Sequence, residues 1–241
     1  MTMGVFGGNS TGGAHNNEDG ALCWSDAHHQ WELAAVLDGH NGADSVRLLL
    51  DVLDSDQRTF VAILSEAVGS AIPRLHRRML DVLSSTDTAL VDGETACLIV
   101  ARKGHYLWWL SVGDCALYVL HPEYARFGQY AVNQRSFFEW VGEVNTFREA
   151  VPCYTTGTKR LRGGRNIILA VTDGVLECGS RPLDAPQRLY DAACYSPDSG
   201  SCGVREILHR VQLEGGTDSA TVVAWDHVCE DPGPYPSNWE G

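Results

Sequence analysis

The apolar residues of this chain lie in short runs that come in pairs, and this pattern restricts the fold more than any other feature. Residues 21–26 and 31–37 flank the polar stretch 27–30, which is typical of two strands joined as a hairpin. The run Leu33-Ala34-Ala35-Val36-Leu37 is nearly all apolar. We therefore expect the second strand to be covered on both faces.

Further strands are indicated along the chain by the same kind of apolar run, at residues 94–102, 105–112, 115–120, 166–171 and 219–225. The first three of these are joined by Lys103-Gly104 and Gly113-Asp114, both of which are tight-turn sequences. Neighbouring strands joined by short turns predict antiparallel pairing, with about ten strands arranged mostly as hairpins.

Helices are predicted where apolar residues recur at helical spacing, as Val46, Leu49, Leu50 and Leu53 do. This spacing predicts helices over about 43–54, 57–84, 184–194 and 203–213, with Pro73 bending or interrupting the second of them. Asn133 is expected to cap a short helix over 134–141.

These elements favour an α+β fold in which two packed antiparallel β-sheets are sandwiched between layers of α-helices, a four-layer αββα arrangement. We expect one domain over residues 1–226. The Pro- and Gly-rich end, 227–241, is expected to be a C-terminal tail.

Composition excludes several classes of partner and location. The 241 residues carry a net charge of −13, which argues against a nucleic-acid-binding face and against binding to an anionic membrane. No apolar stretch approaches the roughly 20 residues that span a bilayer. The eight cysteines include no CxxC pair, and we find no signal peptide. We expect a reduced, cytoplasmic, monomeric protein.

Acidic residues stand at the ends of the predicted strands. Asp38, Asp114 and Asp173 each follow an apolar run, and Asp218 precedes one. Any one of them alone is readily explained as a turn residue. Together with the cluster Asn17-Glu18-Asp19, they indicate an oxygen-ligand site that prefers Mg²⁺, Mn²⁺ or Ca²⁺ over zinc. The spacing alone does not show that they converge.

Six segments, taken in order, resemble the motifs of the protein phosphatase 2C family over about residues 4 to 226. The segments are Asn17-Glu18-Asp19, Val36-Leu37-Asp38-Gly39-His40-Asn41-Gly42, Gly93-Glu94-Thr95-Ala96, Ser111-Val112-Gly113-Asp114, Ala170-Val171-Thr172-Asp173-Gly174-Val175-Leu176-Glu177 and Gly216-Thr217-Asp218-Ser219-Ala220-Thr221. The resemblance implies a metal-dependent serine/threonine phosphatase. Its substrates would be phosphorylated proteins, hydrolysed by direct attack of a metal-bridging water or hydroxide.

The resemblance also implies roles for individual residues. It implies two Mg²⁺ or Mn²⁺ ions, and a third, weaker site. Asp38 would bridge the two metals, and His40 would protonate the departing oxygen. The remaining metal ligands would be Glu18, the Gly39 carbonyl, Asp173 and Asp218, with Asp114 and Glu177 at the third site; Asp19 and Ser219 would support them.

The main departure from the family pattern concerns phosphate binding. Ala14 stands where many members have an arginine. His15 is then the candidate phosphate-binding residue, and Arg162 or Arg165 could reach in from a loop. Residues 121–164 match the family poorly and would correspond to a flap beside the site. An inactive or weak pseudophosphatase that acts as a binding or scaffold module, and a hydrolase of small phosphoesters, are the alternatives. His40 could also be a simple turn residue, and the choice between Mg²⁺ and Mn²⁺ stays open.

Overall fold

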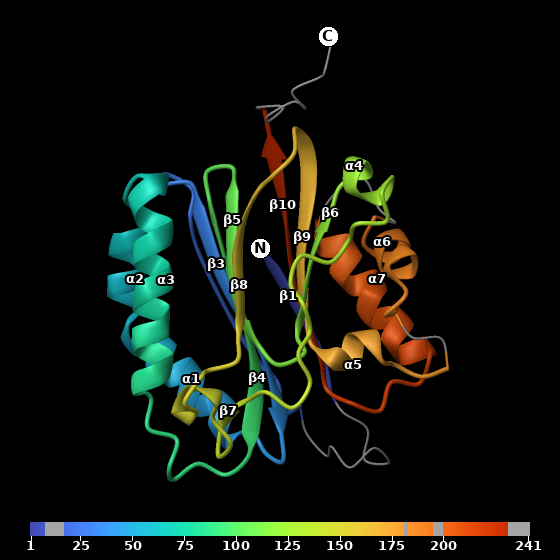
Figure 1. Cartoon of the computed structure of the whole chain (residues 1–241). Coiled ribbons are helices and arrows are strands. Elements are labelled where there is room, and N and C mark those ends of the chain that lie inside the picture. The colour runs from blue at the N-terminus through green and yellow to red at the C-terminus, as the bar shows by residue number, and fades with distance from the viewer. Residues whose placement is uncertain (8–16, 181–182, 195–199, 231–241) are drawn as a thin grey trace.

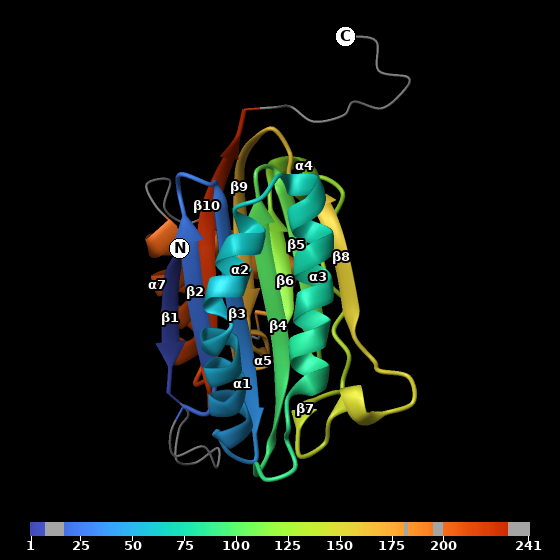
Figure 2. The ribbon, with the colours of Figure 1, turned by 90° about the vertical axis from the view of Figure 1, so that its left-hand side faces the viewer.

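The computed structural model describes residues 1–7, 17–180, 183–194 and 200–230, and only the backbone at 200–202. The described chain forms four layers, with two β-sheets between two groups of helices (Figure 1). This confirms the αββα arrangement expected from the sequence. One outer layer contains α1 (Asp44–Ser55), α2 (Gln57–Leu64) and α3 (Val68–Ser85), and Figure 2 shows these helices lying over the larger sheet. The other contains α4 (Pro122–Ala125), α5 (Asp173–Leu176), α6 (Pro186–Ala193) and α7 (Gly200–Leu213).

Every strand pair is antiparallel. The larger sheet has the order β2-β3-β4-β5-β8, with β7 paired to β4; the smaller has the order β1-β10-β9-β6. The larger sheet consists of β2 (Gly20–Asp26), β3 (Trp31–His40), β4 (Glu94–Lys103), β5 (Tyr106–Val112), β7 (Val141–Gly142) and β8 (Thr155–Arg160). The smaller consists of β1 (Thr2–Phe6), β6 (Ala116–Leu120), β9 (Gly164–Val171) and β10 (Ala220–Cys229). A short 3₁₀ helix, η1 (Thr146–Arg148), precedes β8.

Three apolar layers fill the spaces between the four structural layers, and β3 shows how the sequence builds them. Leu33, Ala35 and Leu37 pack in the cluster with the residues of α1–α3. Ala34 and Val36 point to the opposite face and pack against residues of the other sheet. Both faces of β3 are therefore covered, as its continuous apolar run predicts.

The turn at Gly113-Asp114 differs from the expected hairpin. β5 lies in the larger sheet and β6 in the smaller one, so the chain crosses from one sheet to the other at this point. Gly113 has a φ of +85°, and a Cβ there would lie 2.5 Å from the Ala96 Cβ. A glycine is needed for both reasons, and Asp114 is carried to the edge where the two sheets meet.

Two helix predictions were wrong. The helix expected over 57–84 is two helices, α2 and α3, which are separated at residues 65–67, while Pro73 lies inside α3. No helix forms over 134–141. The Asn133 side chain accepts a hydrogen bond from the Leu117 backbone N–H (2.7 Å) and donates one to the Cys115 carbonyl (2.8 Å). Its polar groups therefore hold β6 in place instead of capping a helix.

The last strand extends further than expected. β10 ends at Cys229, so the first three residues assigned to the tail, 227–229, belong to a strand of the smaller sheet. Residues 231–241, like Ala14 and His15, lie outside the described residues. None of the helices in the described part of the chain is both long and apolar enough to cross a membrane.

Candidate metal centre

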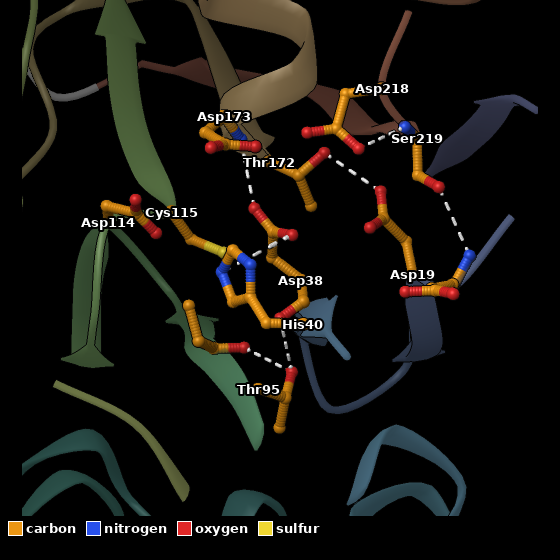
Figure 3. A network of polar contacts seen from close by, with 12 residues as sticks. Asp19, Asp38, His40, Thr95, Asp114, Cys115, Thr172, Asp173, Asp218 and Ser219 are labelled. Atoms are coloured by element: carbon orange, nitrogen blue, oxygen red, sulfur yellow. Dashed lines mark hydrogen bonds and ion pairs between the residues drawn. The ribbon is translucent and has the colours of Figure 1, made fainter. Parts of the chain in front are cut away.

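The acidic residues singled out in the sequence meet at one end of the space between the two sheets (Figure 3). Side chains on a strand alternate between its two faces, so Asp38 and His40 continue the inter-sheet face of Ala34 and Val36. Asp38 pairs with Ala96 of β4. Asp38-Gly39-His40 therefore forms the last three residues of β3 and is not a turn. Asp114, Asp173 and Asp218 reach the same end from the crossing between sheets, the start of α5 and the start of β10.

Asp38 is the most buried of these acids, with 4% of its surface exposed. Its carboxylate Oδ2 accepts a hydrogen bond from the Asp173 backbone N–H at 3.3 Å. Its backbone carbonyl accepts another from the hydroxyl of the fully buried Thr95 at 2.8 Å. A Cβ on Gly39 would lie 2.5 Å from the Glu18 carbonyl oxygen. The absence of a side chain at Gly39 thus lets the Asn17-Glu18-Asp19 segment approach Asp38.

Thr172 joins three chain segments beside Asp38. Its hydroxyl donates to Asp19 Oδ2 at 3.0 Å and accepts from the Thr221 backbone N–H at 2.9 Å. Thr172 immediately precedes α5, which starts at Asp173. The end of β9, the start of β10 and the acidic segment before β2 are therefore held together by one buried hydroxyl.

Asp218 and Ser219 complete this side of the centre. The Ser219 backbone N–H donates to Asp218 Oδ1 at 2.8 Å, and the Ser219 hydroxyl accepts from the Glu18 backbone N–H at 3.1 Å. A Cβ on Gly174 would lie 1.8 Å from the Ser219 carbonyl oxygen. Any other residue at 174 would push the segment just before β10, which carries Asp218, away from Asp173.

The electrostatics of this cluster favour a bound cation. Burial, followed by the negative charges of Asp173 and Asp19, raises the pKa of Asp38 well above its usual value. Burial raises the pKa of Asp19 to about 7, and burial also raises the pKa values of Asp114 and Asp173. One carboxylate oxygen in each of Asp19, Asp114 and Asp173 is buried and accepts no hydrogen bond. Buried carboxylate oxygens without a hydrogen-bond donor are suitable ligands for a hard divalent cation such as Mg²⁺ or Mn²⁺.

His40 lies at the open side of the centre. One ligand atom from each of Asp38, His40 and Asp114 can be chosen so that all three lie within 4.8 Å of one another. His40 Nε2 is 4.0 Å from Asp38 Oδ1, and the imidazole packs edge-to-face on Trp140 with 6.3 Å between ring centroids. The Trp140 ring thus holds His40 next to the acids, and His40 remains partly accessible to solvent.

Arg135 is a residue of this site that the sequence did not reveal. Its Nε donates to the Asp114 carbonyl at 2.6 Å, and its Nη2 donates to Glu177 at 2.7 Å and lies 4.0 Å from Asp114 Oδ2. The guanidinium therefore lies between the two acids expected to hold a third metal. Arg162 and Arg165, considered for phosphate binding, instead pair with Glu123 and Asp226.

The structure thus brings Asp38, His40, Asp114, Asp173, Asp218 and Asp19 to one place, with Gly39, Glu18 and Ser219 in backbone or hydroxyl contact with it. Glu177 lies at its edge, paired with Arg135. The metal-binding and catalytic roles that the resemblance implies for these residues stay predictions, and so does phosphate binding by His15.

The loop 134–140 frames the site. The Ser136 backbone N–H donates to the Gly113 carbonyl at 2.9 Å, which ties this loop to the crossing that carries Asp114. Phe137 and Phe138 are 56% and 82% exposed, and Phe138 has a φ of +66°. Such a conformation is uncommon for an aromatic residue and holds its ring out into solvent.

Of three comparisons with known proteins, only the comparison with solved structures found similar proteins. A scan of the sequence against protein-family models found no match, and a search of curated protein sequences found none either.

Among solved structures, the chain is similar to the catalytic domain of the serine/threonine protein phosphatase PstP in complex with two manganese ions. The two are 17% identical, with 92% of this chain and 95% of that one covered and a TM-score of 0.64. It is also similar to the S. agalactiae serine/threonine phosphatase (15% identity, 94% and 100% covered, TM-score 0.63). PppA of Pseudomonas aeruginosa gives comparable values (18% identity, 93% and 97% covered, TM-score 0.64). This chain therefore has the fold of the bacterial serine/threonine phosphatases of the protein phosphatase 2C type.

Proposed function

We propose that this protein is a metal-dependent phosphatase that hydrolyses phosphoserine and phosphothreonine in proteins. The observation that carries the proposal is the meeting of carboxylates from five chain segments around the buried Asp38, with one buried oxygen in each of Asp19, Asp114 and Asp173 that accepts no hydrogen bond. Such a group of like charges is unfavourable without a cation. A divalent cation accounts for the burial, the raised pKa values and the orphaned oxygens together.

In this proposal Asp38 would help to hold both Mg²⁺ or Mn²⁺ ions, because its carboxylate is at the middle of the cluster. Asp173 and Asp218 would hold one ion, and Glu18 with the Gly39 carbonyl would hold the other. Two bound divalent ions lower the pKa of water and offset the negative charge of a phosphoryl group. Arg135 already pairs with Glu177 and lies 4.0 Å from Asp114 Oδ2, so the third ion implied by the resemblance would have to displace its guanidinium.

His40 would hold the proton that the leaving seryl or threonyl oxygen takes up when the phosphorus–oxygen bond breaks. Two observations support this role. The ring is next to Asp38, and it is partly open to solvent, so a substrate can reach it. Packing on Trp140 limits the orientations of the imidazole, and a fixed donor is what general acid catalysis requires.

Arg135 would hold the substrate phosphate. It would take the role of the arginine that many family members have at the position of Ala14. The guanidinium is at the rim of the centre, and its Nε remains anchored on the Asp114 carbonyl if the bond to Glu177 opens. Its planar group can then donate two parallel hydrogen bonds to a phosphate. The exposed rings of Phe137 and Phe138 on the same loop would contact the polypeptide around the phosphorylated residue.

The test is phosphate release from a phosphothreonine peptide with Mn²⁺ or Mg²⁺, for the unaltered protein and for Asp38→Asn. We expect turnover that needs the metal and falls at least about 100-fold in the variant, since charge stabilisation by the metals is the main catalytic device. Asp54→Asn, which alters an exposed acid on α1, is the matched control and should leave the rate unchanged.

The alternatives give different outcomes in the same experiment. Calorimetric metal binding that depends on Asp38, without any turnover, would replace the enzyme by a binding module with the same fold. Turnover of small phosphoesters but not of phosphopeptides would retain the chemistry and change the substrate class. No metal binding at all would contradict the proposal.

A further inference from the structure

A second cluster of metal-ligating side chains lies at the opposite end of the space between the sheets. On β10, Val223 and Trp225 face this space, and residues at spacings of two share a face, so His227 and Cys229 face it too. Asp218 lies two residues before this ten-residue strand, which extends towards the top of Figure 1. At about 3.4 Å per residue, the two ends of the strand are about 30 Å apart.

His105 completes the cluster from the other sheet. It belongs to the turn that joins β4 and β5, and its Nδ1 is 3.2 Å from His227 Nε2. One ligand atom from each of His105, His227 and Cys229 lies within 4.8 Å of the other two. A site of two nitrogens and one sulfur is therefore assembled from both sheets.

The separations match those around a tetrahedral zinc ion. With zinc–nitrogen bonds of about 2.0–2.1 Å, two nitrogens on one ion are about 3.3 Å apart, close to the 3.2 Å between His105 and His227. A sulfur at about 2.3 Å from the ion would be about 3.6 Å from each nitrogen. Cys229 Sγ therefore needs to approach the nitrogens by at most about 1.2 Å, which a side-chain rotation provides.

The surroundings allow a cation there. The cluster borders a cavity of about 500 Å³ that His105 and His227 line together with Glu230. Arg102 lies beside it, but this guanidinium forms a two-bond ion pair with Glu32 and so adds little net charge.

We propose that His105, His227 and Cys229 form a zinc-binding site that joins the two sheets at the end opposite the acidic centre. The thiol of Cys229 loses its proton to solvent as its sulfur binds, and each imidazole binds through a nitrogen lone pair. The fourth position opens on the cavity, where water or the Glu230 carboxylate can bind. Nitrogen and thiolate ligands favour zinc here, whereas the carboxylates at the other end favour Mg²⁺ or Mn²⁺.

The test uses the full-length protein, stripped with a chelator and then saturated with Mg²⁺ to fill the acidic centre. Titration with Co²⁺ should give one equivalent with a cobalt–thiolate charge-transfer absorption, and Zn²⁺ should displace it. Cys229→Ser and His227→Gln should abolish the absorption and weaken zinc binding at least about 100-fold, since even partners of metal ligands contribute 10–100-fold.

Three control variants separate this site from others. Asp38→Asn should retain the absorption, which makes the result independent of the phosphatase proposal. A His28→Ala/His29→Ala double variant should also retain it, because those rings lie in the exposed turn before β3. Cys153→Ser removes an exposed cysteine and should likewise have no effect.

X-ray absorption of the zinc-loaded, unaltered protein provides a test that does not depend on the folding of any variant. We expect a shell of nitrogen or oxygen at about 2.0–2.1 Å with one sulfur at about 2.3 Å. A shell without sulfur, a thiolate absorption that survives Cys229→Ser, or no uptake in the presence of Mg²⁺ would each overturn the proposal.

Discussion

Replacing Asp19 by asparagine should stabilise the metal-free protein at neutral and alkaline pH. Asp19 lies before β2, where its Oδ2 accepts from the Thr172 hydroxyl and its Oδ1 accepts nothing. An asparagine retains an oxygen for Thr172 and replaces a carboxylate that is costly to ionise among other acids. The substitution therefore removes a charge and preserves the hydrogen bond.

The size of the effect follows from the pKa of Asp19, which burial raises from 3.8 to about 7. Below pH 3.8 the carboxyl is protonated in both states and contributes no difference. As the pH rises towards 7, the unfolded chain releases the proton while the folded one retains it, so the free energy of unfolding falls. At about 1.4 kcal/mol per pKa unit, the loss is at most about 4 kcal/mol above pH 7.

The assay is urea unfolding in a chelator at a series of pH values between 4 and 8. The difference in unfolding free energy between Asp19→Asn and the unaltered protein should grow over this range in favour of the variant. Asp54→Asn, an exposed acid, should show no such growth. Saturating Mn²⁺ at pH 8 should reduce the difference, because a bound cation stabilises the ionised carboxylates. A difference that does not change with pH would refute the reasoning.

Three further predictions concern packing, phosphate binding and thiol reactivity. Gly174→Ala should lower the free energy of unfolding by about 3 kcal/mol, since its Cβ would overlap a backbone carbonyl. Gly69→Ala, in α3 with open space around it, should instead raise that free energy by about 0.5 kcal/mol; denaturant unfolding compares the two. Arg135→Gln should raise KM for a phosphopeptide about 10-fold with little change in kcat, while Arg165→Gln leaves both unchanged; equal effects would exclude a specific role for Arg135. Cys97, whose pKa burial raises to about 12, should react with alkylating reagents at pH 8 only after unfolding, as mass spectrometry of labelled protein would show.

The strands and the gathering of acids could be predicted because the information lies in short segments. A strand covered on both faces needs a nearly unbroken apolar run, and β3 has one from Leu33 to Leu37. The inward direction of Asp38 then follows from its spacing from Val36 on the same strand. That the acids converge came from the resemblance of six ordered segments to a known family.

The crossing at Gly113-Asp114 could not be predicted, because the same turn sequence suits a hairpin and a change of sheet. The choice depends on the pairing of β6 with β9, about 50 residues further along the chain. Arg135 was missed for a similar reason, since Glu177 and Asp114 are its partners only after folding. His227 and Cys229 gave no recognisable metal motif, because their third partner is in the turn between β4 and β5.

The pairing of β1 with β10 affects the order in which the protein can become functional during synthesis. β1 and β10 are neighbours, with Thr2 opposite Ala224, so the smaller sheet joins the first and last strands of the described chain. The larger sheet needs no residue beyond Arg160 and can form on a shorter nascent chain. Contacts this distant in sequence form late. The acidic centre needs Asp218 and both sheets, so a ribosome-bound chain cannot assemble it until Asp218 and β10 have left the ribosome.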